Sequence, residues 1–160
     1  SGGPLVNALG EVIGINSFIY TGSNYSTGSI GIGFAIPVDA ARRFLDEVRT
    51  HGRVRKPWTG IVDMTTFTPR LGRYLALSIS EGAIVTHVAV DSPAADSGLK
   101  RGDAIVAING EKVRSEEEAW GILRSLRVGD TGSLAVVNTD GRHIVTFRLR
   151  EMQQQRQGWY

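Results

Sequence analysis

The feature that most constrains this chain is the stretch from residue 92 to residue 113, SPAADSGLKRGDAIVAINGEKV, which combines two turns with one short apolar strand. Pro93 and Gly98 bracket a predicted helical turn, because proline suits the start of a helix and glycine readily takes the left-handed conformation that ends one. Residues 104–108 are apolar and rich in β-branched side chains, which is typical of a buried strand. Asn109-Gly110 is a strong tight-turn signal. The stretch therefore predicts a small domain built on short strands and tight turns.

Composition narrows the class of protein without deciding it. A chain of 160 residues can hold one large domain or two small ones, and its 20 glycines favour β structure with many turns. The net charge of +2 is too small to indicate nucleic-acid binding, and the basic cluster Arg53, Arg55 and Lys56 is interpreted as a solvated linker rather than a phosphate site. The absence of cysteine excludes disulfides and thiolate catalysis. The sequence shows neither a signal peptide nor an apolar run long enough to cross a membrane.

The first fifty residues predict three strands and a helix. Short apolar runs on either side of a turn predict a hairpin over residues 5–15, and a Gly/Ser/Thr-rich loop at 20–29 separates it from a strand at 30–36. Pro37 suits the first turn of a helix that Gly52 ends. Apolar residues recur along this helix at helical spacing, at Val38, Ala41, Leu45 and Val48.

The remainder of the chain predicts a second β-rich domain with short helices. Thr68-Pro69 is a helix start, and Ser115 with Glu118 forms a capping box at the start of a second helix that reaches about Leu126. The core-facing stripe of this second helix is predicted at Ala119, Ile122, Leu123 and Leu126. Thr139-Asp140-Gly141 predicts a hairpin. The predicted strands of this part cover residues 61–64, 82–90, 104–108, 134–138 and 144–149.

Two motif sets carry a resemblance to a known family. The order SPA, then GL, then GD, then ING resembles the centre of PDZ domains, and the order SGGPLVN, then GEVIGINS, then GIGFAIP resembles the end of the catalytic domain of HtrA/Deg-type serine proteases. In that family a trypsin-fold domain precedes one or two PDZ domains. The resemblance implies a mainly β fold with short helices, in which a partial trypsin-like β-barrel segment is followed by a PDZ domain, a small β-barrel capped by two helices. The expected domains are residues 1–52 for the protease part, 53–57 for a linker, 58–150 for the PDZ domain and 151–160 for a tail.

Ser1 matches the family's nucleophilic serine, although the Gly-Asn that precedes it in the family motif is absent here. A serine needs a neighbouring base and an orienting group, and in trypsin-like folds both precede it in sequence. His51, His87 and His143 all follow Ser1, and we interpret them as ordinary surface or strand residues. One of the two oxyanion donors is also missing with the absent glycine. We therefore expect no peptidase activity from this chain alone. An alternative, in which the amine of Ser1 acts as its own base, has no further support in the sequence.

The resemblance also implies a substrate pocket in the first segment. Residues Ile15, Asn16 and Ser17 match the strand beside the substrate backbone. Ile32, Gly33 and Phe34 match an apolar wall of the specificity pocket, which favours small or medium aliphatic side chains. The loop at 19–29 resembles one whose ordering activates the family's proteases. The alternative interpretation of all these residues is plain strand and loop.

The first segment supplies too few strands for a closed barrel. A trypsin-type barrel needs about six strands, and this segment provides about three, which would leave strand edges and an apolar face exposed. We therefore expect the residues up to about Ala35 to be disordered, swapped with another chain, or paired with a neighbour's edge.

A peptide groove is implied in the PDZ part. Trp58-Thr59-Gly60-Ile61 matches the aromatic–x–Gly–aliphatic loop that holds a peptide's terminal carboxylate, and glycine lets successive amides point to one side. The strand after it, with Val62 and Met64, would pair with the peptide. The helix line that faces the groove by resemblance consists of Glu116, Trp120, Leu123 and Arg124. In this view Trp120 covers an apolar ligand side chain, Leu123 lines the terminal pocket, Arg124 assists the carboxylate and Glu116 favours a polar or basic residue upstream. A plain strand start and an ordinary core or surface tryptophan are the alternatives.

These observations predict a piece of an envelope serine endopeptidase of HtrA/Deg type for protein quality control. By family resemblance it is located in the bacterial periplasm or cell envelope. Its PDZ domain would bind hydrophobic C-terminal segments of unfolded proteins, its full-length parent would form a trimer, and neither metal nor cofactor is expected. A non-enzymatic PDZ adaptor is the alternative from another class. The tail, Gly158-Trp159-Tyr160, is either a disordered terminus or a ligand for the groove of another molecule.

Overall fold

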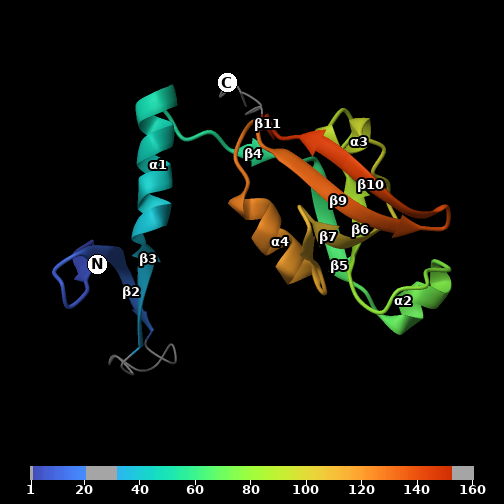
Figure 1. Ribbon diagram of the computed structural model, residues 1–160, viewed down its shortest axis with the longest axis horizontal. Coiled ribbons are helices and arrows are strands. Elements are labelled where there is room, and N and C mark those ends of the chain that lie inside the picture. Colours follow the sequence, from blue (N-terminus) through green and yellow to red (C-terminus); the bar gives the residue numbers. More distant parts are fainter. Residues whose placement is uncertain (1, 21–31, 153–160) are drawn as a thin grey trace, which may run out of the picture. The chain divides into compact units, whose positions relative to one another are not determined.

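The computed structural model describes residues 2–20 and 32–152 and divides the chain into two compact units, Ser1–Val54 and Arg55–Tyr160 (Figure 1). Each unit is built from its own elements and is described separately. None of the described helices is both long and apolar enough to pass through a bilayer.

The first unit contains one antiparallel sheet of three strands in the order β1-β2-β3. These strands are β1 (Pro4–Val6), β2 (Val12–Tyr20) and β3 (Ile32–Pro37). The predicted hairpin turn between β1 and β2 is present because the Asn7 side-chain oxygen accepts the backbone N–H groups of Leu9 and Glu11, and Gly10 supplies a φ of 80°. β2 continues well past the predicted end of its strand at residue 15.

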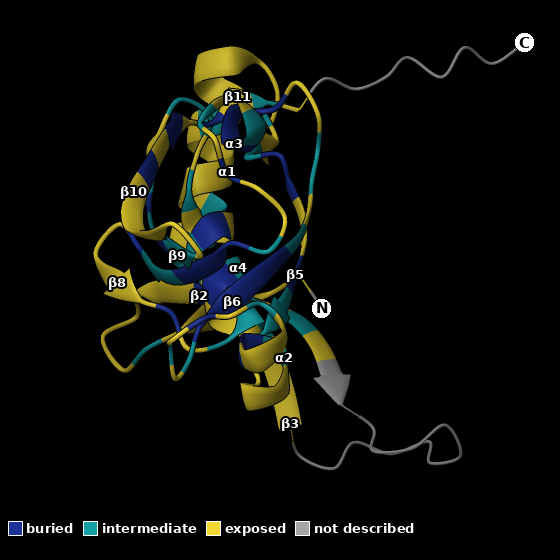
Figure 2. Ribbon diagram, turned by 90° about the vertical axis from the view of Figure 1, so that its right-hand side faces the viewer, coloured by how far each residue is buried: buried dark blue, intermediate teal, exposed yellow. Residues whose placement is uncertain are grey.

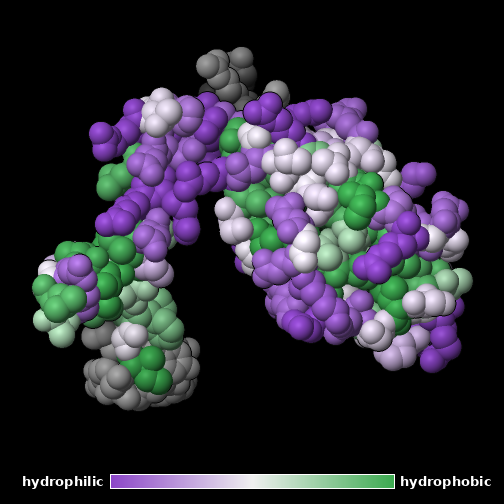
Figure 3. Space-filling view, in the orientation of Figure 1, coloured by the Kyte–Doolittle hydropathy of each residue, from purple (hydrophilic) through white to green (hydrophobic). Residues whose placement is uncertain are grey.

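Helix α1 (Val38–His51) follows β3 directly, as the sequence predicts. The helix begins one residue later than expected, because Pro37 is its N-cap rather than part of its first turn. Gly52 ends the helix with a φ of 71° and an N–H bond to the Val48 carbonyl. The apolar stripe of α1 is not covered within the unit. Among the described residues of this unit only Gly14 is buried, and Figure 3 shows hydrophobic side chains gathered over the strands. The first unit therefore has a regular backbone without a hydrophobic core of its own.

The three-stranded sheet is open, as expected for a partial barrel. Of the three expected states of this segment, disorder does not describe β1, β2 and β3, because backbone hydrogen bonds pair these strands in a sheet. Pairing of this sheet with another chain remains a prediction.

The second unit is a PDZ-like arrangement of strands and short helices. Its main sheet has the order β10-β9-β7-β6-β5, with β8 beside β7, and β4 pairs separately with β11. The helices are α2 (Pro69–Tyr74), α3 (Pro93–Asp96) and α4 (Glu116–Ser125). The strands are β4 (Pro57–Trp58), β5 (Ile61–Thr66), β6 (Ala83–Val88), β7 (Ala104–Ile108), β8 (Glu111–Lys112), β9 (Thr131–Asn138), β10 (Gly141–Arg148) and β11 (Arg150–Glu151).

The core of this unit lies between the main sheet and α4. Ile105 and Ile108 of β7 and Leu134 of β9 are fully buried, as the apolar run at 104–108 predicts. Helix α4 packs on them through Ala119 and Leu123, which are the buried members of its predicted stripe. In Figure 2 the buried residues of this unit gather around β6, in the middle of the main sheet.

The predicted helix starts are made by hydroxyl caps. The side-chain oxygen of Ser92 accepts the N–H of Ala95, and that of Ser115 accepts the N–H of Glu118. The second half of the predicted capping box is wrong by one residue. The Glu118 carboxylate accepts the N–H of Arg114 at 2.9 Å, because the chain turns back toward it before the helix begins.

Asp103 is the buried carboxylate that fixes the turn before β7. It is 3% exposed, and its two oxygens accept the backbone N–H of Lys100 at 2.8 Å and the side-chain amide of Asn138 at 2.9 Å. Gly102 precedes it with a φ of 94°. The carboxylate thus joins the turn to the end of β9.

We expect Asp103→Ala to lower the free energy of unfolding by about 2 kcal/mol, because two bonds to a buried charged acceptor are lost and the partner groups lose their acceptor. Chemical denaturation measured by circular dichroism tests this. Asp140→Ala, at the exposed hairpin turn, is the control and should change stability by less than about 0.5 kcal/mol. Equal effects of the two substitutions would contradict the assignment.

Candidate functional site

The second unit carries a hollow of about 520 Å³ beside α4. Its walls come from the last turns of α4, from β4 and the loop after it, and from the chain on either side of β11. Its lining is mostly apolar, and Arg124 is the one charged residue among those described in it. We call this hollow the groove; it is lined by Pro57, Trp58, Thr59, Ile61, Val62, Trp120, Leu123, Arg124, Leu149 and Met152.

The loop at 58–61 is held against the start of α3. The carbonyl of Thr59 accepts the N–H of Ala94 at 2.9 Å, and the carbonyl of Gly60 accepts the N–H of Ala89 at 2.8 Å. Gly60 has a φ of 90°, and a Cβ at this position would lie 2.1 Å from both Cβ and Oγ of the fully buried Ser92. Only glycine therefore fits here, both for its conformation and for the space available.

One backbone N–H of the loop predicted to bind the peptide carboxylate already bonds a side chain of the same loop. The hydroxyl oxygen of Thr59 accepts the backbone N–H of Ile61 at 3.1 Å. A ligand carboxylate that binds this N–H must displace the hydroxyl, which can then donate its own proton to the ligand. Sequence reasoning assigned Thr59 to the loop and missed this bond, although serine and threonine commonly make such local bonds to the backbone two residues on.

Helix α4 contributes an aromatic and a cationic group to the groove. The guanidinium carbon of Arg124 lies 5.8 Å from the centre of the Trp120 ring, a cation–π geometry that holds both side chains beside the groove. Leu123 lies next to them and closes the groove toward the core. The structure therefore brings together Trp120, Leu123 and Arg124 as the helical spacing predicts.

Two of the predicted peptide-binding residues lie elsewhere. Met64 is 3% exposed and belongs to the core, so its predicted place in the groove is corrected. The reason is that the pairing of β5 with β6 shifts register between Ile61 and Met64, which breaks the simple alternation of sides along the strand. Glu116 does not line the groove; its backbone N–H bonds the hydroxyl of Thr66 and ties the start of α4 to β5.

The groove also uses residues that the sequence analysis assigned to the linker and the tail. β11 pairs with β4 in the register Arg150↔Trp58, and the N–H of Met152 donates to the Lys56 carbonyl at 2.9 Å. This pairing places Leu149 and Met152 in the wall of the groove. A strand of two residues has no recognisable periodicity in sequence. The only sequence signal for this wall was that the apolar Leu149 and Met152 flank the polar residues Arg150 and Glu151.

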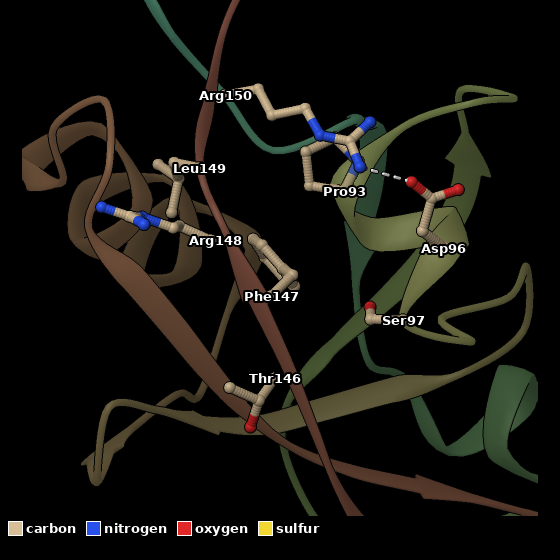
Figure 4. Close-up of a pocket in the computed structure, with 8 residues that line it drawn as sticks. All are labelled: Pro93, Asp96, Ser97, Thr146, Phe147, Arg148, Leu149 and Arg150. Atoms are coloured by element: carbon tan, nitrogen blue, oxygen red, sulfur yellow. Dashed lines mark hydrogen bonds and ion pairs between the residues drawn. The ribbon is translucent and has the colours of Figure 1, made fainter.

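A smaller hollow of about 330 Å³ lies between α3 and the end of β10 (Figure 4). Asp96 and Arg150 form an ion pair of 2.6 Å across it. Ser97 and Thr146 add hydroxyls to its lining. Leu149 lines both this hollow and the groove, so the two share one side chain.

Two carboxyl groups outside the groove have shifted pKa values. The pKa of Glu117 is lowered mainly because the Ser115 hydroxyl donates a hydrogen bond to it, and that of Glu81 is lowered mainly by its bond to Lys112. A lowered pKa in the folded state stabilises the fold above the unfolded pKa, and this contribution is lost as the pH falls through the folded value. Neither carboxyl lines the groove.

The first unit has a separate hollow of about 670 Å³ on its sheet. It brings together four of the predicted pocket residues, Asn16, Ser17, Gly33 and Phe34, with Phe34 stacked on Phe18 at 4.7 Å between ring centres. Ile15 and Ile32 belong to the same two strands but are not in the lining.

The backbone beside this hollow is partly occupied. The N–H and the carbonyl of Asn16 already bond Gly3 and Gly2, so a substrate strand finds no free backbone there. Ser1 lies outside the described residues, as does most of the predicted activation loop at 19–29. Among the described residues no cluster of His, Asp, Glu or Cys is arranged to hold a metal ion.

Two family models match the chain, that of the PDZ domain over residues 45–145 and that of trypsin over residues 1–45. The chain belongs to the PDZ domain family. In this chain the PDZ domain follows a trypsin-like segment, which is the order that the motifs predict. The prediction of a mainly β, trypsin-like and PDZ fold is therefore confirmed.

Comparison with whole proteins confirms the resemblance to the HtrA/Deg type. A probable periplasmic serine endoprotease, DegP-like, from Pseudomonas fluorescens is 37% identical over 89% of this chain and 29% of its own length. A protein of the same name from Brucella suis is 38% identical over 85% of this chain and 26% of its own length. The solved structure of the HtrA-type protease AlgW with a decapeptide has a TM-score of 0.73 at 33% identity, over 96% of this chain and 46% of that one. The chain thus spans less than a third of the length of each of these two curated relatives.

We expect Gly60→Ala to lower the free energy of unfolding by at least about 2 kcal/mol, because the new Cβ collides with Ser92 and disfavours the left-handed backbone. Gly121→Ala is the matched control. Gly121 lies in α4 with nothing within 4 Å of an added Cβ, so the same substitution should raise stability by about 0.5–1 kcal/mol. Urea denaturation of both variants checks the opposite signs, and a neutral Gly60→Ala would show that the loop does not depend on this contact.

Proposed function

We propose that the PDZ unit binds the free carboxyl end of hydrophobic peptide segments in the groove. The observation that supports this most directly is the groove itself, in which an apolar cavity lies beside the loop at 58–61 and one guanidinium. The related AlgW structures, with a decapeptide and with a tripeptide, add support because those proteins are described with peptides.

The ligand would add to the sheet as a further strand. β5 is the last strand in the order of the main sheet, so its outer edge is available for pairing beside α4. Val62 on this strand is 53% exposed and lines the groove. Backbone pairing to β5 would supply affinity that does not depend on sequence, and the side chains of the groove would supply selectivity.

The chemistry at the end of the groove suits an anion next to an apolar side chain. The Ile61 N–H, the hydroxyl of Thr59 and the guanidinium of Arg124 are the donors on this side, and each can bond a carboxylate. Trp120, Leu123, Leu149 and Met152, which all line the groove, would enclose the terminal apolar side chain. Glu116 lies at the other end of α4 and would favour a polar or basic residue upstream in the peptide.

We further propose that the first unit is the end of the trypsin-like domain of an envelope serine endopeptidase that acts in protein quality control. In such a protein Ser1 would attack the peptide carbonyl, with a His as base and an Asp as its orienting group. This rests on the trypsin match over residues 1–45 and on the relatives reported above, whose name is "probable periplasmic serine endoprotease DegP-like". Unfolded proteins would be the substrates and a trimer the assembly. The tail beyond Met152 is a candidate ligand for the groove of another copy.

A PDZ adaptor without protease activity is the second candidate. The observation that favours it is the first unit, whose described residues bury almost nothing and whose sheet is open. The coding sequence upstream of Ser1 distinguishes the two, because a protease requires a His and an Asp in a trypsin-like context there.

We expect the chain to prefer free-acid peptides with a hydrophobic last residue over the same peptides with amidated ends by roughly tenfold or more, because a charged acceptor is lost. Fluorescence anisotropy with paired peptides measures this. Arg124→Gln should weaken free-acid binding several-fold, whereas Arg127→Gln, at an exposed position just after α4 and outside the groove lining, should not. Equal affinity for acid and amide ends would rule out carboxylate recognition.

We expect the chain of residues 1–160 to show no peptidase activity by itself, because no base is supplied to Ser1. A fluorogenic casein assay and labelling with a serine-directed fluorophosphonate test this. Turnover that disappears in Ser1→Ala would contradict the expectation and would support Ser1 using its own amine as base.

A further inference from the structure

The sulfur atoms of this chain are few and differ sharply in their surroundings. The sequence has no cysteine and two methionines. Met64 is 3% exposed and is enclosed by the core of the PDZ unit, whereas Met152 is 46% exposed and forms part of the wall of the groove. The more exposed of the two methionines therefore lies at the site proposed to bind peptides.

The backbone that carries Met152 is fixed on three sides. Its own N–H donates to the Lys56 carbonyl, and β11 just before it pairs with β4. The Arg150 guanidinium is paired with Asp96 on α3, as Figure 4 shows. Leu149, buried at the start of this segment, lines the same groove. These contacts hold residue 152 in the wall of the groove that Trp120 and Leu123 of α4 also line, so a change in its polarity changes that lining.

We propose that Met152 is an oxidation site whose conversion to the sulfoxide weakens peptide binding. The oxidant is a peroxide, for which hydrogen peroxide is the simplest case. The thioether sulfur attacks one peroxide oxygen, a sulfur–oxygen bond forms as the oxygen–oxygen bond breaks, and the second oxygen leaves as water after proton transfer. The sulfur loses two electrons and the peroxide gains them, and a methionine sulfoxide reductase can reverse the change.

The effect on binding follows from polarity. A thioether is apolar and adaptable, and it suits the wall of a cavity that takes an apolar side chain. A sulfoxide carries a strongly polar oxygen, which loses hydration when a ligand closes over it. We expect oxidation to weaken the binding of a hydrophobic free-acid peptide by roughly three- to tenfold. This consequence rests on the proposed function of the groove, whereas the reactivity of Met152 does not.

The test uses the whole chain with graded doses of hydrogen peroxide. Peptide mapping by mass spectrometry follows the oxygen gained at Met152 and Met64, and anisotropy follows the affinity for a labelled hydrophobic free-acid peptide. We expect Met152 to oxidise at least about tenfold faster than Met64, and the affinity to fall in step with it. The affinity of Met152→Leu before peroxide serves as its own reference, and it should not fall after peroxide. Met64→Leu, a similar exchange in the core, should remain as sensitive as the parent chain.

Each other outcome overturns a defined part of the proposal. If Met64 reacts as fast as Met152, the assignment of the accessible site is wrong. If Met152 is oxidised without loss of affinity, or if Met152→Leu loses affinity equally after peroxide, the sulfoxide does not control the groove. If the chain binds no peptide before peroxide, the proposed function is overturned as well. If it binds equally well before and after peroxide, the proposed function stands and only the role of the sulfoxide is overturned.

Discussion

The PDZ unit depends on one close approach, that of Gly60 to Ser92. Ser92 is buried, caps α3 with its hydroxyl and occupies the space in which any side chain at position 60 would lie. The carbonyls of Thr59 and Gly60 then bond Ala94 and Ala89 on either side of this contact. Residues that are remote in sequence are thus fixed as one surface, and the groove is positioned by the same serine that begins the helix. The motif around Ser92 and the loop at 58–61 therefore depend on each other for their conformation.

The predictable part of this fold is the part that local chemistry dictates. Gly98 and Gly110 have the positive φ angles that the turn motifs imply, and Asn109 also has a positive φ, of 50°. Hydroxyl caps begin the helices where the sequence indicates. The groove side of α4 also follows from spacing, because one helical turn separates Trp120 from Leu123 and Arg124. These features need only a few neighbouring residues to specify them.

The unpredicted part depends on pairing between distant segments. The register shift of β5 moves Met64 into the core, and no local pattern announces a bulge of this kind. The pairing of β4 with β11 is specified by only two residues on each side, yet it brings Met152 to the groove. In the first unit, each strand and the helix could be predicted from the sequence. Their apolar side chains stay exposed, because no surface among the described residues of this unit covers them.

The pairing of β4 with β11 also determines how the domain responds to force. These two short strands are where the chain enters and leaves the PDZ unit, and they lie side by side in antiparallel register. A pull on the chain before Pro57 and after Glu151 would open this pair one hydrogen bond at a time, because these two residues face each other at the same end of the pair and are drawn apart along their hydrogen bonds. Trp58 and Met152 would leave the groove while the sheet beneath it stayed intact, so mechanical tension on the chain would release a bound peptide before it unfolded the domain.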